Sequence, residues 1–339
     1  MTLNPFIRFI LRRLGFLVTT FIIFLLIIFI LPRTIPGNPL AALLYQIIQR
    51  AETNPDLIRA VEKRLMDEFG VGKPLHIQFL EFLSRLFRGD LGTSISFYPR
   101  KVADLAFSFL PWSLGLLIPA TLVSWIVGNL LGALAAYRRK TIVDNALLPA
   151  FLTLSQTPYY WLAMILLYIL AVKFDIFPLG GAYSTIKIPA LTISFIVDML
   201  HHYVLPFVSI VMGAIGGWAI GMRSMVIYEL ESDYVSYADM LGLPDNRVLR
   251  YVFRNSMLPQ VTGLALNLGL IMGGALITEL VFSYPGTGFL IFKALSTLDY
   301  PLIQGTFILL ISTLLVANFI VDLIYAYIDP RIRTGYVGE

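Results

Sequence analysis

The sequence predicts an all-α integral membrane protein with six transmembrane helices. Hydrophobic residues make up 58% of the 339 residues and charged residues only 14%, whereas about a quarter of a soluble globular chain is charged. The mean hydropathy is +0.79. The apolar runs are continuous, while the strands of a membrane-spanning barrel would alternate in polarity over short segments. These observations favour helices that cross a lipid bilayer.

Six segments are long and apolar enough to cross the hydrocarbon core, which takes about 20 residues of helix. They are residues 10–31, 109–136, 145–172, 204–222, 261–282 and 302–327. Pro158 falls inside the third segment, and a span tolerates such a proline where neighbouring groups satisfy the freed carbonyl. The first apolar run is longer than the core of a signal peptide, about 7–15 residues, so we expect it to be retained as a span.

The distribution of Lys and Arg predicts which side of the membrane each loop faces, because cytoplasmic loops are enriched in both. Basic residues gather at the N-terminus, in 137-YRRKT-141, in the interval 223–260 and in the C-terminal tail. With six spans these four segments share one side. We therefore expect both termini in the cytoplasm of a prokaryote and the chain in its cytoplasmic membrane. Residues 32–108, 173–203 and 283–301 then lie outside.

The long external segment is predicted to be helical. In 56-DLIRAVEKRLMDEFG-70 the apolar side chains recur at i+4 steps on one face, and 75-LHIQFLEFLSRLF-87 is a second amphipathic stretch. The pair forms either a docking surface or a cover for the span ends. The predicted organisation is thus a first helix (1–31), an external helical insertion (32–108) and a five-helix core (109–339) with a polar cytoplasmic loop at 223–260.

That loop contains the longest polar stretch of the second half, 233-DYVSYADMLGLPDNRVLRYVFRNSMLPQ-260. Its pattern predicts a helix from Tyr234 to Leu241, a turn at 242-GLP-244, and a second helix that ends at Leu258-Pro259. Glycine at the turn permits backbone conformations that other residues rarely adopt. Two short helices joined in this way make a compact projection that fits a groove on a soluble partner, although an ordinary surface loop is the alternative.

This stretch resembles the cytoplasmic coupling loop of ABC importer permeases, and the wider sequence resembles the peptide/nickel type, the dipeptide and oligopeptide permeases. Ala238, Gly242 and Leu258-Pro259 occupy the positions of the loop motif. Asp239, Met240 and Leu241 depart from the small and basic residues usual before the glycine, and Ser236 replaces a glutamate. The matching words are 229-ELESDYVSYADMLGL-243, 254-RNSMLP-259, 36-PGNP-39, 89-GDLGTS-94, 177-FPLGG-181, 279-ELVFSYPGTG-288, 299-DYPLIQG-305 and 328-IDPRIR-333.

The resemblance implies a permease that forms a pathway with a second homologous permease and is driven by two ABC ATPase subunits, with an extracytoplasmic solute-binding protein delivering substrate. The implied coupling residues are Tyr237, Ala238, Asp239, Gly242, Leu243, Arg247, Leu258 and Pro259. Peptides are the default substrate of the family. Oligosaccharides and nickel chelates stay open, as does whether the two ATPases are identical. A carrier that needs no ATPase is the alternative class, but the sequence shows no internal repeat of the kind expected there.

We expect no catalytic residue, cofactor or metal in this chain itself. It lacks the G-x-x-x-x-G-K-[ST] loop that cradles nucleotide phosphates, so ATP and magnesium belong to the partner subunits. It has no cysteine, and the pair His201-His202 has no matching carboxylate cluster. The composition gives no sign of nucleic-acid binding.

Polar side chains within spans are costly and so mark candidate pathway, gate or helix–helix contacts. The candidates are Asn129, Ser155, Gln156, Asn267, Thr278 and Glu279. For Glu279 we expect a role in gating or in an external salt bridge. Asp322 is expected to pair with a basic residue near the cytoplasmic end of the last span. Gly269 and Gly273 form a small-xxx-small pair that permits close helix approach.

Overall fold

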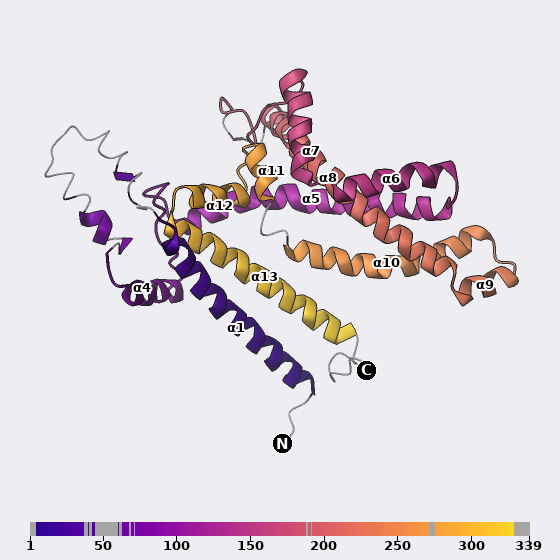
Figure 1. Ribbon diagram of the computed structural model, residues 1–339, viewed down its shortest axis with the longest axis horizontal. Helices are drawn as coiled ribbons and strands as arrows, with labels where there is room; N and C mark the ends of the chain where they lie inside the picture. The colour runs from indigo at the N-terminus through magenta and orange to yellow at the C-terminus, as the bar shows by residue number, and fades with distance from the viewer. Residues whose placement is uncertain are drawn as a thin grey trace. The chain divides into compact units, whose positions relative to one another are not determined.

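The structure is a computed structural model of the chain (Figure 1). It describes residues 5–36, 40, 43–44, 60, 63–67, 69–70, 72–187, 189–190, 192–270 and 275–328. Every regular element among them is helical, which confirms the predicted all-α class. The chain divides into two compact units, Met1–Pro111 with Thr287–Glu339 and Trp112–Gly286, and each is described by itself.

The first unit is built around α1 (Pro5–Thr34) and α13 (Tyr300–Ile328), which pack side by side (Figure 1). Arg13 Nη1 lies 3.2 Å from Asp322 Oδ2, so the predicted pairing of Asp322 with a basic residue is confirmed. The short helix α12 (Thr287–Ser296) packs against α13. It falls in the predicted loop 283–301, where its ten residues are too few to suggest a span.

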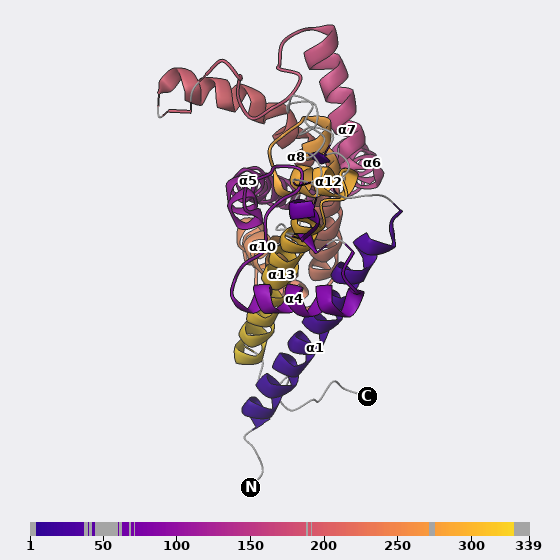
Figure 2. The same ribbon diagram turned by 90° about the vertical axis from the view of Figure 1, so that its left-hand side faces the viewer.

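The predicted second helix of the insertion is present as α4 (Leu75–Phe87). It lies against α1 (Figure 2). The Phe29 ring is 5.0 Å from that of Phe79 and 5.7 Å from that of Phe82. Of the predicted helix 56–70, the described residues 60, 63–67 and 69 are helical. Gly70 follows with a φ of +65°, the conformation expected where a helix stops at glycine.

Two of the sequence words meet inside the first unit. The side chain of Asp299, fully buried at the start of 299-DYPLIQG-305, accepts hydrogen bonds from the Ser94 hydroxyl at 2.6 Å and from the Ser96 backbone N–H at 2.8 Å. Its other oxygen accepts from the Leu302 N–H at 3.1 Å and so caps α13. The carboxylate thereby ties the end of the insertion to the last helix.

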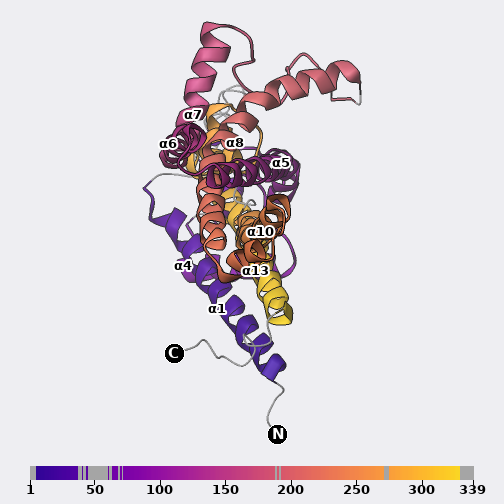
Figure 3. The same ribbon diagram turned by 90° about the vertical axis from the view of Figure 1, so that its right-hand side faces the viewer.

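The second unit contains most of α5 (Val102–Tyr137), then α6 (Ile142–Gln156), α7 (Tyr159–Leu166), the π-helix η1 (Leu167–Lys173) and the long α8 (Ile193–Leu230). It ends with α9 (Asp233–Met240), α10 (Asp245–Leu270) and α11 (Leu276–Val281). α8 packs against both α6 and α10 (Figure 3). α5 meets α8 closely at Gly132, where an added Cβ would overlap the backbone of Ala219.

The predicted segment 145–172 is bent, because α6 and the helix from Tyr159 to Lys173 meet at 97° next to Pro158 (Figure 1). Two other predicted boundaries are wrong. α8 begins at Ile193, well inside the predicted loop 173–203. The second helix of the polar loop does not end at Leu258-Pro259, because α10 runs on through Pro259 to Leu270.

By length and composition, α1, α5 and α8 can each cross a membrane, and the bent pair can form a fourth span. These counts concern only the described residues. In α13 the apolar stretch Tyr300–Val316 is shorter, and the predicted span 261–282 contains residues 271–274, which lie outside the described part. The same gap takes in Gly273, so the predicted glycine pair with Gly269 lies outside the described residues.

Candidate functional site

The predicted coupling loop folds as a short helical projection between α8 and α10, which we call the α9 knob (residues 233–244). Ala238 and Val235 face inward, with exposed fractions of 7% and 5%, and pack with Met222, Val248 and other apolar residues. Tyr237, on the opposite face, is 64% exposed. The alternation of inward and outward positions follows the helical period, and it anchors the knob while leaving one face uncovered.

Gly242 closes α9 with a Schellman-type cap. Its φ is +72°, its N–H donates to the Asp239 carbonyl at 2.9 Å, and the Leu243 N–H donates back to the Ala238 carbonyl at 3.2 Å. Glycine suits this position because it adopts the left-handed region without a Cβ penalty. A Cβ on Gly242 would meet nothing within 4 Å, so the turn leaves open space over the glycine.

The uncovered face of the knob carries large side chains in water-accessible positions. Tyr237, Met240 and Leu241 are 64%, 82% and 62% exposed. Asp239 and Arg247 are also exposed. Contiguous exposed apolar side chains with charges at the rim are typical of a protein–protein contact. The structure thus places Tyr237, Asp239 and Gly242 on the α9 knob and Arg247 in the first turn of α10, with Ala238 and Leu243 turned toward the supporting helices.

Leu258 and Pro259 lie elsewhere. Both are exposed, Leu258 by 69%, and they stand in the middle of α10 and not at its end. The predicted role of this pair as the end of the loop is therefore wrong. The predicted contact of this pair with an ATPase subunit stays a prediction.

Glu229 is a positioning residue that the sequence analysis did not single out. One of its carboxylate oxygens accepts from the Tyr234 hydroxyl of α9 at 2.7 Å and from the Asn255 amide of α10 at 3.4 Å. Burial, followed by the hydrogen bond to Glu229, raises the pKa of Tyr234. The carboxylate therefore links the end of α8 to both helices that follow. The only signal in the sequence was its place at the start of the matched word 229–243.

An ion pair joins α8 to α6. Arg223 donates to the Asp144 carboxylate twice, from Nε at 2.8 Å and from Nη2 at 2.9 Å. The two side chains are 18% and 6% exposed. Such a forked pair fixes both distance and orientation. The end of α8 that leads to the α9 knob is thus attached to the first turn of α6.

Glu279 lies in a tight turn at residues 279–286, the Glu279 turn. Its side chain is fully buried and accepts a hydrogen bond from the Ser113 hydroxyl at 2.6 Å. The Tyr284 N–H donates to the Glu279 carbonyl at 2.7 Å, and a Cβ on Gly286 would overlap the Glu279 carboxylate. The turn is built around this carboxylate, which explains why glutamate and glycine stand at its two ends.

The turn also contacts the matched word 177-FPLGG-181. The Gly181 N–H donates to the Phe282 carbonyl at 2.7 Å. Phe282 is 2% exposed and belongs to the main apolar core of the second unit. Two sequence words about 100 residues apart therefore form one packed junction.

The other pathway candidates are distributed over several helices. Asn129 is buried in α5 and donates to the Trp125 carbonyl of its own helix, and Ser155 donates to the Leu152 carbonyl at the end of α6. Gln156 and Asn267 are exposed. Asn129 Oδ1 and Thr278 Oγ1 are buried and have no hydrogen-bond partner among the described residues. Both side chains lie within the packed interior of the chain, at 2% and 0% exposed.

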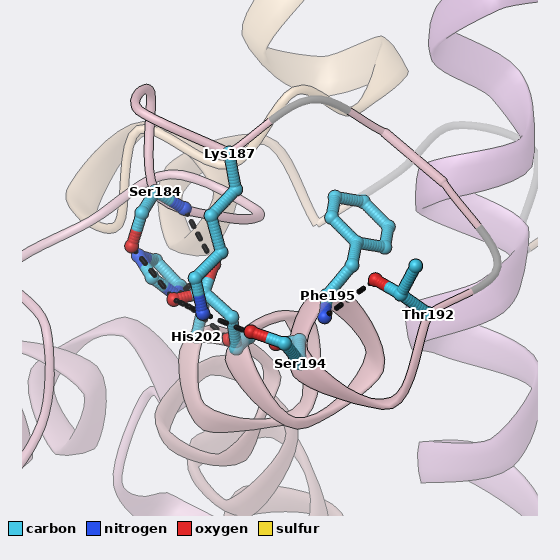
Figure 4. Close-up of polar contacts among 7 residues, drawn as sticks. Ser184, Lys187, Thr192, Ser194, Phe195 and His202 are labelled. Atoms are coloured by element: carbon cyan, nitrogen blue, oxygen red, sulfur yellow. Dashed lines mark hydrogen bonds and ion pairs between the residues drawn. The ribbon is translucent and has the colours of Figure 1, made fainter.

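The loop before α8 is held by Asp198. The Ser184 N–H and hydroxyl each donate to its carboxylate at 2.7 Å, and Lys187 Nζ lies 3.4 Å away. Figure 4 shows Ser184, Lys187 and His202 converging from the loop and the helix. The cluster fastens the loop to the first turns of α8.

The adjacent histidines do not form a joint site. His201 Nε2 lies 2.8 Å from the Ile176 carbonyl oxygen, and His202 Nδ1 lies 2.8 Å from the Asp198 carbonyl oxygen. Their rings are 6.5 Å apart and nearly perpendicular. Within the described part of the chain, no group of three or more His, Asp or Glu side chains could hold a metal ion.

Comparison with known proteins gives the class to which this arrangement belongs. The family of binding-protein-dependent transport system inner membrane components matches residues 128–334. The chain belongs to this family. The matched range includes the α9 knob and the Glu279 turn. It identifies the chain as an inner-membrane component of a transport system, and the apolar helices make it a multi-pass membrane protein.

The relatives are peptide permeases. The chain is 32% identical over 354 residues to the dipeptide transport system permease protein DppB of Escherichia coli, with 96% of this chain and 99% of the relative covered. It is 31% identical to a di/tripeptide transport system permease protein of Pseudomonas aeruginosa, with the same coverage. It is 29% identical to the oligopeptide transport system permease protein AppB of Bacillus subtilis, with 90% and 92% covered. The resemblance found in the sequence words is confirmed.

Proposed function

We propose that this chain is the membrane-spanning permease subunit of an ABC importer for di- or oligopeptides. The family match and the substrates named for three relatives that align over at least 90% of the chain support this assignment. A second homologous permease completes the pathway, an extracytoplasmic binding protein delivers the peptide, and two ATPase subunits bind ATP and magnesium. Both termini and the α9 knob lie in the cytoplasm, in keeping with the basic residues of these segments.

The observation that carries the mechanism is the exposed face of the α9 knob. Tyr237, Met240 and Leu241 stand uncovered on a helix whose other face is anchored, as helix-in-groove recognition requires. An ATPase subunit binds this face. Its closure on ATP moves the knob, and the movement reaches α8 and α10 through Glu229. Arg223 passes it on to α6 through Asp144.

Alternating access then follows as a shift between two states of the permease pair. The permease supplies no chemistry of its own. It contributes two arrangements of helices whose populations depend on the nucleotide state of the partner subunits. Buried polar atoms on Asn129 and Thr278 are candidate pathway or gate contacts in this scheme.

The test is the substitution Gly242→Asp in the complete transporter reconstituted with its binding protein. A Cβ at this glycine meets nothing within 4 Å in this chain, and Asp tolerates the left-handed region better than most residues. We therefore expect normal membrane insertion and assembly, with loss of peptide uptake and of ATPase stimulation by the binding protein.

The matched control is Gly72→Asp, at another left-handed glycine, with a φ of +93°, that also has open space around its missing Cβ. This variant should keep both activities. Normal stimulation of ATP hydrolysis in Gly242→Asp would remove the docking assignment. Peptide binding measured on the partner binding protein separately tests the substrate.

A further inference from the structure

An apolar groove lies between α1 and the beginning of α4, within the first unit. Its volume is about 340 Å³, and Leu26, Phe29 and Ile30 line it from α1. Leu75 and Phe79 line it from α4, and Arg33 stands in the same wall. Seven residues of helix separate Leu26 from Arg33, which corresponds to about 10 Å along α1. The groove is thus lined by apolar side chains, with the guanidinium of Arg33 toward the C-terminal end of α1.

The guanidinium of Arg33 is held in a fixed position. Its Nε donates to Gln78 Oε1 at 2.9 Å, and its Nη1 donates to the Phe29 carbonyl at 2.7 Å. Its central carbon lies 3.8 Å from the centroid of the Phe29 ring and 5.4 Å from that of Tyr300. Arginine has five N–H donors, so several stay unused. Among the described residues, no carboxylate forms a salt bridge with Arg33.

The walls of the groove continue into a surface that is suited to lipid. α1 is the most apolar of the candidate spans, and only 17% of its most apolar window is buried. On α4, Leu75 and Leu80 are 61% and 63% exposed. A helix that exposes such residues beside a membrane span is stable when it lies at the boundary of headgroups and acyl chains. The apolar residues exposed on α1 and α4 beside the groove suit contact with lipid acyl chains.

We propose that this groove binds one anionic phospholipid from the leaflet in which the C-terminal end of α1 lies. An acyl chain occupies the apolar part, and the phosphate accepts hydrogen bonds from the free donors of Arg33. Arginine matches a phosphate in geometry, and the pair is stronger where water is scarce. A net negative lipid neutralises the unpaired charge, whereas a zwitterionic lipid would bring a second cation with it.

The experiment uses the intact transporter, purified in detergent and stripped of lipid. Its thermal midpoint is measured with added phosphatidylglycerol and with phosphatidylcholine of the same acyl chains. We expect phosphatidylglycerol to raise the midpoint by about 2–4 °C more than phosphatidylcholine does. Arg33→Gln should abolish this difference. Arg88→Gln, which removes an equal charge at the exposed end of α4, should retain it.

Two further measurements separate lipid binding from binding of a soluble anion. Ile30→Trp fills the groove without touching the charge and should reduce the phosphatidylglycerol effect. Glycerol phosphate, which has the headgroup chemistry but no acyl chain, should not stabilise the protein. An Arg33-dependent effect of glycerol phosphate would replace the lipid by a soluble ligand and overturn the proposal. It is equally overturned if the wild type does not distinguish the two lipids, as expected where another subunit covers the groove.

Because the readout is the difference between two lipids within each variant, a general loss of stability in Arg33→Gln cancels. Arg33→Lys provides a check on geometry, since it keeps the charge but loses the fork. We expect it to retain part of the difference. This inference does not depend on the transported substrate or on the role of the α9 knob.

Discussion

The Glu279 turn follows the short helix α11, and the α9 knob is built on the short helix α9; each contains a glycine, Gly286 or Gly242, but the first buries its central side chain and the second exposes several. In the turn, Glu279 is fully buried and Gly286 packs directly on its carboxylate. In the knob, Tyr237 and Met240 are 64% and 82% exposed, and the space over Gly242 is empty. Gly286 is required because a larger side chain would overlap the Glu279 carboxylate. Gly242 is required because its backbone lies in the left-handed region.

This difference separates residues that hold the permease together from residues that are available to a partner. In the turn, the Glu279 carboxylate forms a hydrogen bond within the chain. Changes there should therefore reduce the amount of folded protein. The knob satisfies its backbone locally and leaves one face exposed, so changes to the side chains on that face should spare folding. The sequence alone does not distinguish a structural turn from an exposed contact surface, because both segments match the family motifs equally well.

The largest effect on stability is expected at the ion pair between α6 and α8, the helix that leads to the knob. Asp144→Ala leaves Arg223, whose side chain is only 18% exposed, without its counter-ion, and removing one partner of a buried pair costs about 3–5 kcal/mol. The thermal midpoint and the yield of assembled transporter in detergent should both fall sharply.

The control is the double variant Asp144→Leu with Arg223→Met. Replacing both partners by apolar side chains avoids the unpaired charge and is often nearly neutral for stability. We expect it to regain most of the lost stability but not full transport, since the link between α8 and α6 is gone. A single Asp144→Ala variant as stable as the wild type would mean that this pair does not hold the helices together.

The next effect concerns the Glu279 turn directly. In Gly286→Ala the new methyl group overlaps the Glu279 carboxylate, and overpacking of this kind costs about 1–3 kcal/mol. The yield of folded permease after solubilisation should fall. Gly217→Ala in α8 is the matched control, because a Cβ there meets nothing within 4 Å. If both variants behaved alike, the turn would not be packed as described.

Much of the fold could be predicted, because long apolar runs determine spans almost alone. α1, α5 and α13 lie where continuous hydrophobicity placed them, and α4 matches its amphipathic stretch. The two prolines show what the runs do not reveal. Pro158 begins a new helix direction, whereas Pro259 lies within α10. The sequence predicts the opposite for each: Pro158 within a continuous span, and Pro259 at the end of a helix.

The packing explains why α10 continues. Val248, Val252, Ser256 and Gln260 are at most 7% exposed, and they follow one another at four-residue steps on one face. This buried stripe runs past Pro259 without interruption, so tertiary contacts offset the hydrogen bond that the proline removes. Two of these four positions are the polar residues Ser256 and Gln260, so the sequence pattern alone does not indicate a buried face.

The position of the helical projection around Gly242 could be predicted from the sequence, but the contacts of the buried acids could not. The motif around Gly242 identified the knob, and helical spacing explains which of its residues are exposed. The partners of the buried acids could not be found in this way. Asp299 meets Ser94 across 205 residues and Asp144 meets Arg223 across 79. Periodicity describes the face of one helix, and such pairs depend on which helices become neighbours.

A smaller effect is expected at the glycine of the knob. Gly242→Ala introduces a methyl group that meets nothing, so its cost comes only from the left-handed backbone, about 1–2 kcal/mol. Gly242→Asn should cost less, because Asn visits this region more readily. The thermal midpoints of the two variants should therefore differ in this order. Equal losses would indicate a packing contact at the turn and would weaken the contrast with Gly286.

The smallest effect is expected at the exposed ion pair beside the knob, Arg139 with Glu231. The two atoms lie 3.0 Å apart, but the side chains are 47% and 69% exposed. Pairs of this kind contribute about 0.2–1 kcal/mol, since water and salt screen them. A double-mutant cycle with alanine at each position should give a coupling in that range that shrinks as salt is added. The distance is close to the 2.8 Å between Arg223 and Asp144. The two pairs therefore differ mainly in how far they are buried. A salt-independent coupling of several kcal/mol would show that the surface around the knob is covered in the assembled transporter, and it would place Glu231 inside the interface with the partner.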